Sequence, residues 1–216
     1  MADRWATFDC YGTLIDWNGG IRSQLARVFG EDSADGLLER YHELEPQIEH
    51  EQPKLSYRAV MAEAMKQLGA PPEEQDALGA SLPQWPVFPE VPPALAEARA
   101  RGWRLAALSN TDFDLIKQSI SAIGVPFDTL IVASDIGSYK PAHRHWDVFF
   151  ERTGAPREGH VHVAQSHFHD IVPADELGLR SIWVNRLGER HEPAPTRELP
   201  DLAGLADTLD ELVPAA

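Results

Sequence analysis

Short apolar runs alternate with helical patterns along most of this 216-residue chain. Each run is bounded by polar turn residues, which predicts a buried strand. The stretches between the runs carry helical periodicity or helix caps. Strands that alternate with helices indicate an α/β fold, with a doubly wound, mainly parallel sheet and helices on both of its faces. The predicted strands are residues 5–8, 104–108, 129–133, 160–164 and 181–184.

Residues 18–86 break this alternation because they carry helical patterns alone. The clearest pattern spans residues 57–68, where the apolar positions form one stripe after Ser56, a suitable N-cap. Residues 34–50 also show helical spacing, and we expect Pro46 to kink or end that helix. The region therefore predicts a helical unit inserted after the first strand.

A Pro-rich segment at residues 83–93 leads from this insertion back to the alternating pattern. We therefore divide the chain into an α/β core, residues 1–16 and 87–216, and a helical domain, residues 17–86. Near the end of the chain, residues 188–200 are predicted to form a polar loop.

Composition narrows the class of partner. The net charge of −15 at pH 7 argues against binding to nucleic acid or to an anionic membrane surface. A small anionic molecule would need local positive groups, because the overall field repels it. The chain has neither a signal pattern at its start nor an apolar run long enough to span a bilayer, so we expect a soluble cytoplasmic protein. Its one cysteine, Cys10, is expected to be a buried structural residue.

Asp9 directly follows the first predicted strand. Open α/β sheets bind their ligands at this end of their strands. Gly12 allows a sharp turn there, and Thr13 offers a hydroxyl and a backbone N–H that can point back to the carboxylate. Taken alone, Asp9 would equally well cap a turn.

The second predicted strand is followed by Ser109 and Asn110. The helix after it is predicted to start at Thr111, which forms a capping-box-like pair with Asp114. Ser109 and Asn110 are therefore either a plain N-cap cluster or an anion site at a helix N-terminus.

Two further polar residues follow the third and fourth strands. Lys140 stands before a proline after the third strand, and Asp170 ends the polar segment after the fourth. A lysine on a loop is usually solvated, but the carboxyl ends of parallel strands meet at one edge of a sheet. We therefore expect Lys140 and Asp170 to lie near Asp9.

Together these segments resemble the four motifs of the haloacid dehalogenase superfamily. Asp9, Gly12, Thr13 and Leu14 are in register with its first motif, Asp-x-x-Gly-Thr-(Leu/Val). The resemblance implies a Rossmann-like core with a helical cap, here residues 17–86, inserted after the first strand. It also implies that Asp9 is a nucleophile that forms a covalent ester with the substrate.

The resemblance assigns roles to the other segments as well. Ser109 and Asn110 would bind the substrate's carboxylate, while Thr13 would help to position carboxylates. Lys140 would neutralise part of the negative charge of the nucleophile and the substrate. Asp170 would orient Lys140 or the hydrolytic water.

Position 11 distinguishes branches of the superfamily. Phosphatases carry a second Asp two residues after the nucleophile, whereas this chain has Tyr11. A phosphatase must protonate an alkoxide leaving group, but a halide leaves without a proton. The Asp-x-Tyr-Gly-Thr form resembles the L-2-haloacid dehalogenase branch, which implies that Tyr11 contacts the substrate. The alternative is that Tyr11 fills a core position and an acid comes from elsewhere.

The helical domain offers Arg40, which lies 31 residues after Asp9, the spacing of the arginine that grips the substrate in the dehalogenase branch. A guanidinium there would pair with a carboxylate or a departing halide. The alternative is a solvated arginine paired with Glu43. Trp17 and Trp85 flank the crossings between the two domains, where they would wall an apolar pocket or serve ordinary domain packing.

Three positions depart from the dehalogenase branch: Gln165 and His167 replace Ser and Asn, and Trp146 replaces a Tyr. An imidazole at His167 or His169 would still hydrogen-bond the substrate or help the hydrolytic water. Gln165 removes an acidic residue that phosphatases use to hold Mg²⁺, which prefers carboxylate ligands. We therefore expect no cofactor, with Mg²⁺ at Asp9 and Asp170 as the alternative.

These observations predict a hydrolytic dehalogenase of short 2-haloalkanoic acids, acting on a small anionic substrate. Two alternatives stay open: a Mg²⁺-dependent phosphatase of the same superfamily, and a catalytically silent protein that kept the fold for binding. The resemblance alone suggests a homodimer.

Overall fold

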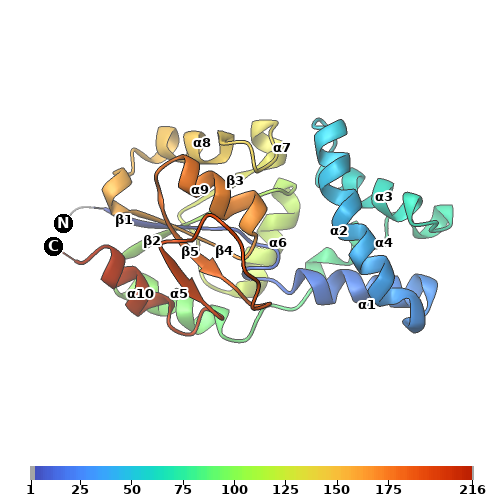
Figure 1. The fold of residues 1–216 in the computed structure, drawn as a ribbon, viewed down its shortest axis with the longest axis horizontal. Helices are drawn as coiled ribbons and strands as arrows, with labels where there is room; N and C mark the ends of the chain where they lie inside the picture. The colour runs from blue at the N-terminus through green and yellow to red at the C-terminus, as the bar shows by residue number, and fades with distance from the viewer. Residues whose placement is uncertain (1–2, 216) are drawn as a thin grey trace.

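The computed structural model describes residues 3–215. Its centre is a six-stranded sheet in which every neighbouring pair of strands is parallel, in the order β3-β2-β1-β4-β5-β6. This confirms the predicted doubly wound α/β fold (Figure 1). The strands are β1 (Arg4–Phe8), β2 (Trp103–Ser109), β3 (Thr129–Val132), β4 (His160–Ala164), β5 (Arg180–Val184) and β6 (Arg197–Leu199).

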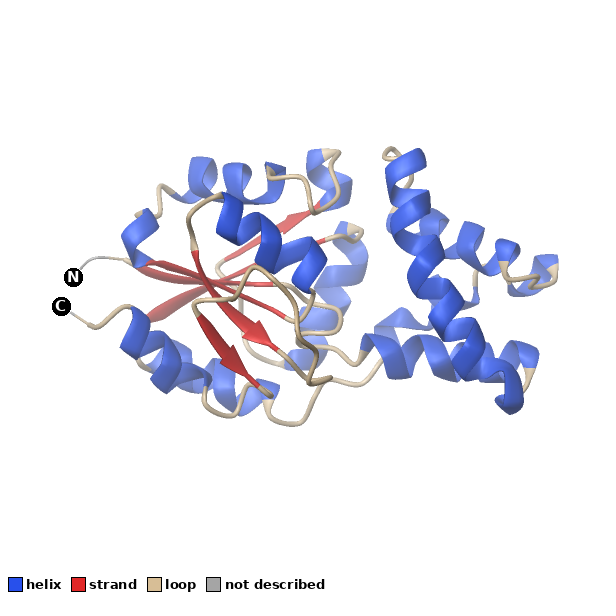
Figure 2. Ribbon diagram, viewed as in Figure 1, coloured by secondary structure: helices blue, strands red, loops and turns tan. Residues whose placement is uncertain are grey.

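Helices cover both faces of the sheet (Figure 2). One face is covered by α5, α6 and α10, and the other by α8 and α9. Because both faces are buried, the strands need nearly continuous apolar runs, and every residue of β1 and β4 is buried. The helices are α5 (Val91–Ala100), α6 (Phe113–Ile123), α7 (Ala133–Ile136), α8 (Arg144–Thr153), α9 (Val172–Glu176) and α10 (Leu205–Leu212).

The edge strand β6 contradicts the loop predicted for residues 188–200. Its three residues pair with β5, with Arg197 opposite Ile182. Its side chains are exposed or only partly buried, so the sequence carries no apolar alternation there. Only Leu199 of this strand packs against the core, so a three-residue edge strand leaves no hydrophobic alternation in the sequence.

Four helices, which we call the cap helices, lie together at one end of the sheet (Figure 1). They are α1 (Trp17–Phe29), α2 (Ala34–Glu51), α3 (Tyr57–Gln67) and α4 (Ala77–Ser81). The predicted N-cap is confirmed, since the Ser56 hydroxyl accepts a hydrogen bond from the Ala59 N–H. The expectation for Pro46 is wrong as far as a helix end is concerned, because α2 continues past it. Leu44 and Ile48, buried on either side of the proline, stabilise the continuous helix by packing.

The cap helices are joined to the sheet region by contacts over the strand ends. The Asp112 carboxylate accepts hydrogen bonds from the backbone N–H groups of Tyr57 and Arg58, both at 3.0 Å. Asp112 thus caps α3 rather than its own helix. The capping box predicted from Thr111 is wrong, because α6 begins at Phe113 and the Thr111 hydroxyl makes no hydrogen bond. Among the described residues, none of the helices has the length and apolar character that a membrane span needs.

Candidate active site

Asp9 follows the central strand β1, where its backbone N–H donates to the Val163 carbonyl of β4. The Thr13 hydroxyl donates to Asp9 Oδ2 at 2.7 Å, so the turn bends back on the carboxylate as expected. Gly12 makes this turn possible, since its φ of +89° lies in the region that favours glycine. A Cβ at Gly12 would also meet Gln165 Oε1 at 3.1 Å.

Lys140 joins the two carboxylates of the site. Its ammonium group donates to Asp9 Oδ1 at 3.0 Å, to Asp170 Oδ1 at 2.7 Å and to the Leu108 carbonyl at 2.9 Å. Burial alone would lower the pKa of Lys140, but the two carboxylates outweigh it and raise the pKa. The lysine is therefore charged, and its three N–H donors are all engaged.

The two carboxylates have opposite electrostatic environments. Burial raises the pKa of Asp9 above its ordinary value, although Lys140 and Thr13 act against it. Asp170 is also buried, but Lys140 and His162 outweigh that effect and lower its pKa to about 2. Asp170 therefore stays ionised, while Asp9 is the more basic and hence the more nucleophilic carboxylate.

A buried chain of hydrogen bonds connects Asp170 to His162, Thr7 and His160. His162 Nε2 lies 2.9 Å from Asp170 Oδ1, and the Thr7 hydroxyl bridges His162 Nδ1 and His160 Nε2, both at 2.8 Å. The side chains of Thr7, His160 and His162 have no exposed surface. Burial lowers the pKa of His160 far below its ordinary value, so that ring is neutral.

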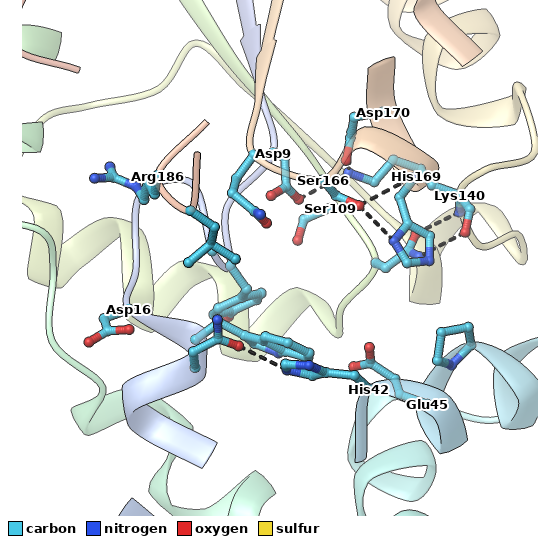
Figure 3. A pocket seen from close by; sticks show the side chains of 18 of the residues that line it. Asp9, Asp16, His42, Glu45, Ser109, Lys140, Ser166, His169, Asp170 and Arg186 are labelled. Atoms are coloured by element: carbon cyan, nitrogen blue, oxygen red, sulfur yellow. Dashed lines mark hydrogen bonds and ion pairs between the residues drawn. The ribbon is translucent and has the colours of Figure 1, made fainter. Parts of the chain in front are cut away.

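Asp9, Lys140 and Asp170 form one wall of a pocket of about 420 Å³ between the strand ends and the cap helices (Figure 3). Ser109 lines it, with a hydroxyl that is almost fully buried and makes no hydrogen bond. Asn110 also lines it, but its side chain braces Lys140, accepting from the Lys140 N–H at 2.6 Å and donating to the Lys140 carbonyl at 3.0 Å. The Ser109 hydroxyl is therefore free to bind a ligand.

Tyr11 lines the pocket with its ring rather than its hydroxyl. The hydroxyl lies 3.0 Å from Ser119 Oγ on α6. Burial raises the pKa of Tyr11, so it supplies no acid near neutrality. Trp17 also lines the pocket, whereas Trp85 packs beneath it against Tyr11. Cys10 is buried with a raised pKa and is an unreactive thiol, as expected.

Two predicted site residues are not brought to the pocket. Arg40 lies on the exposed face of α2 and pairs with Glu43, which is the alternative that the sequence left open. His167 contacts the Pro193 carbonyl at 2.8 Å and packs against Trp183. Trp146 is fully buried against His162, so it contributes no polar contact to the pocket.

Of the two histidines that the sequence offered, the pocket contains His169, and it also contains residues that the motifs did not indicate: His42, Glu45, Glu49 and Arg186. Glu45 lies five residues after Arg40, which puts the two about 140° apart around the helix. The buried positions Tyr41, Leu44 and Ile48 mark the inner face of α2 and would have identified Glu45 as well.

The residues around Asp9 do not fit a magnesium site. Asp9 and Asp170 each already accept a hydrogen bond from the Lys140 ammonium, and Gln165 is neutral. Residues 3–215 contain no group of three or more His, Cys, Asp or Glu side chains arranged to hold a metal ion.

Comparisons with known proteins agree with this geometry. A family model described as haloacid dehalogenase-like hydrolase matches residues 4–164. The (S)-2-haloacid dehalogenase 4A of Burkholderia cepacia is 25% identical over 98% of this chain and 94% of its own. The phosphoserine phosphatase of Thermus thermophilus is 28% identical over 65% of this chain, and the match spans only 59% of that protein.

Solved structures show the same fold. The L-2-haloacid dehalogenase of Xanthobacter autotrophicus superimposes with a TM-score of 0.83 at 18% identity, over 96% of this chain and 98% of that one. The fold, the strand-end motifs and the family match agree with one another. The chain belongs to the haloacid dehalogenase-like hydrolase family, and we describe it as an enzyme that resembles the (S)-2-haloacid dehalogenases of that family.

Proposed function

We propose that this hydrolase removes halide from short 2-haloalkanoic acids through an ester intermediate on Asp9. The observation that carries the proposal is the Lys140 ammonium between Asp9 and Asp170, at 3.0 and 2.7 Å, beside a residue 11 that offers no acid. This arrangement suits a carboxylate nucleophile whose leaving group needs no proton.

In the first step, one oxygen of Asp9 attacks the halogen-bearing carbon, the carbon–halogen bond breaks, and halide leaves with the bonding electrons. Arg40 faces solvent, so the guanidinium that lines the pocket is that of Arg186, which pairs with Glu90 at 2.7 Å. The aromatic side chains of Trp17, Tyr57 and Phe88 line the pocket and offer the positive edges of their rings.

In the second step, water attacks the carbonyl carbon of the Asp9 ester. The ester uses one Asp9 oxygen, and the negative charge that develops on the other is stabilised by the donor which that oxygen already has, Lys140 for Oδ1 or Thr13 for Oδ2. The water donates a hydrogen bond to Asp170 Oδ2, which has no partner in the protein. Burial lowers the pKa of His169 to about 4, so the ring is neutral and takes the proton that the water releases. The bond between the Asp9 carbonyl carbon and the substrate oxygen then breaks, and His169 returns the proton to that oxygen, which leaves as the hydroxyl of the 2-hydroxy acid. The regenerated Asp9 carboxyl loses its proton to solvent.

The substrate's carboxylate is proposed to bind Ser109, whose buried hydroxyl is unpartnered. Ser109 ends β2, beside the carbonyl of Leu108 that receives Lys140. A carboxylate bound there lies within the field of the lysine without displacing its three hydrogen bonds.

One paired assay tests the proposal. We expect chloride release from 2-chloropropionate in the presence of a chelator, and no phosphate release from an aryl phosphate with Mg²⁺. Phosphate release alone would favour the phosphatase suggested by the relative from Thermus thermophilus. Asp9→Asn should abolish chloride release, and a fully active Asp9→Asn enzyme would refute the scheme.

A further inference from the structure

The cap side of the pocket presents two carboxyl groups to the nucleophile. Glu45 and Glu49 lie one turn apart on α2, and both are more than nine-tenths buried. Figure 3 shows Glu45 across the pocket from Ser109 and Lys140. If both groups were ionised, an anionic substrate would meet two negative charges in addition to Asp9 and Asp170.

The hydrogen bonds of Glu45 leave one of its oxygens facing the pocket. Tyr57 donates to Glu45 Oε1 at 2.7 Å, and Tyr41 donates to the same oxygen at 3.5 Å. The Tyr57 hydroxyl in turn accepts from Trp17 Nε1 at 2.9 Å, which fixes its direction. Glu45 Oε2 has no hydrogen bond within the described part of the chain, so it is the oxygen free to carry a proton into the pocket.

Glu49 has a similar arrangement, with Asn110 Nδ2 donating to its Oε2 at 3.2 Å. Neither glutamate forms an ion pair with any cation of residues 3–215. A buried carboxyl without a cationic partner favours its neutral form.

The other charged groups that face this pair act in both directions. Burial is the main cause that raises the pKa of Glu45 to about 7, and Asp9 adds to it while Tyr57 and Tyr41 oppose it. Burial and the charge of Glu45 raise the pKa of Glu49, against the lowering effect of Lys140. Both shifts favour a protonated carboxyl in this pair.

Among residues 3–215, two cations line the core side of the pocket, Lys140 and Arg186, and both are already paired with carboxylates, Arg186 with Glu90 at 2.7 Å. All three donors of Lys140 are engaged, and Ser109 offers one unpartnered hydroxyl that is 99% buried, since its exposed fraction is 1%. A ligand with two carboxylate oxygens needs a second donor, and Glu45 lies across the pocket from Ser109.

We propose that Glu45, sharing a proton with Glu49, recognises the substrate's carboxylate as a neutral carboxylic acid that donates a hydrogen bond from Oε2. The inference rests on the proposed function for its carboxylate ligand. It makes Glu45 a specificity-determining residue. Anions bind only when the Glu45–Glu49 pair carries a proton, whereas the binding of neutral analogues does not require that proton.

The test is calorimetric binding of propionate, an unreactive carboxylate, to the full chain from pH 6 to pH 9. Above the pKa of the pair, the Kd should rise by about tenfold per pH unit, because each bound anion requires one proton. Titrations in two buffers of different ionisation enthalpy should show uptake of one proton at pH 8.5. Propionamide should bind with a Kd that does not change with pH.

Glu45→Gln is the informative variant, because the amide is a neutral donor of the same shape. It should bind propionate with a Kd independent of pH and without proton uptake. Glu43→Gln is the matched control, since it removes the same charge from the exposed face of α2 and should keep the pH dependence of the unmodified chain. Propionate binding that is independent of pH, or preferential binding of propylammonium, would overturn the inference.

The two proposals fail separately. Proton-linked propionate binding without chloride release from any 2-haloacid refutes the proposed function and leaves the role of Glu45 intact. Chloride release with propionate binding that takes up no proton refutes the role of Glu45 alone.

Discussion

His162 Nε2 lies 2.9 Å from Asp170 Oδ1, the oxygen that also accepts from Lys140. One assignment of protons that satisfies the chain behind this contact starts from the neutral ring of His160. His160 Nε2–H donates to Thr7, the Thr7 hydroxyl donates to His162 Nδ1, and His162 Nε2–H donates to Asp170. His160 Nδ1 is then a bare lone pair, which accounts for its having no partner although it is buried.

Replacing Thr7 by Val tests this chain, because valine keeps the shape and removes the hydroxyl. Two buried imidazole nitrogens would lose their partner, which costs about 1–3 kcal/mol of unfolding free energy. We expect kcat to fall while KM stays constant, because Asp170 is no longer held against Lys140. Thr7→Ser should restore both quantities. A Thr7→Val enzyme that is less stable but keeps its kcat would show that the chain serves folding alone.

The lowered pKa of Asp170 predicts how stability responds to acid. A carboxyl whose pKa falls on folding stabilises the native state above its unfolded pKa and loses that contribution as pH falls through the folded pKa. For Asp170 this window extends from the ordinary value, about 3.9, down to about 2. Urea unfolding between pH 5 and pH 2 should show a shallower loss for Asp170→Asn than for the unmodified chain. Equal slopes would contradict the assignment.

Arg40→Ala should leave KM for 2-chloropropionate unchanged, although the spacing from Asp9 predicts that this residue binds the substrate. Its side chain is 56% exposed and pairs with Glu43, an exposed ion pair of a kind worth well under about 1 kcal/mol. Steady-state kinetics of the variant check this directly. A tenfold rise in KM would mean that α2 rotates to bring Arg40 inward when substrate binds.

Asp112→Ala should loosen the cap helices, because Asp112 holds the first backbone N–H groups of α3 from the core. Loss of an N-cap carboxylate costs about 1 kcal/mol. Hydrogen exchange at Tyr57 and Arg58 should accelerate, and KM should rise. Asp114→Ala is the control. Asp114 is exposed and lies on α6, and its carboxylate pairs with the Arg58 side chain rather than with the backbone of α3. Equal exchange in both variants would contradict the role of Asp112.

The core side of the site was predictable from the sequence because its positions are local. Asp9, Ser109 and Asp170 come at or just after the ends of neighbouring parallel strands, and such ends meet at one edge of the sheet. Gly12 and Thr13 complete the first turn for the same reason. Because the strands are neighbours in the sheet, the positions of these motifs along the chain predict that their side chains lie close together.

The cap side was not predictable in this way. The spacing from Asp9 to Arg40 does not determine which face of α2 points inward. The burial of Leu44 and Ile48 places Glu45, rather than Arg40, on the inward face. A similar problem affects the segment after β4, where a π-helical turn, His167–Ile171, points His169 into the pocket and His167 towards Trp183. Helical phase depends on packing with distant residues, which motifs do not record.

The central claim is that Asp9 itself becomes esterified and that water then attacks its carbonyl carbon. Turnover of 2-chloropropionate in H₂¹⁸O, under conditions where each enzyme molecule turns over many times, followed by mass spectrometry of the peptide that contains Asp9, tests it directly. We predict that ¹⁸O enters the Asp9 carboxylate, because hydrolysis of the ester leaves the water oxygen on the enzyme. Label found only in the lactate product, with an unlabelled Asp9 peptide after many turnovers, would contradict the account.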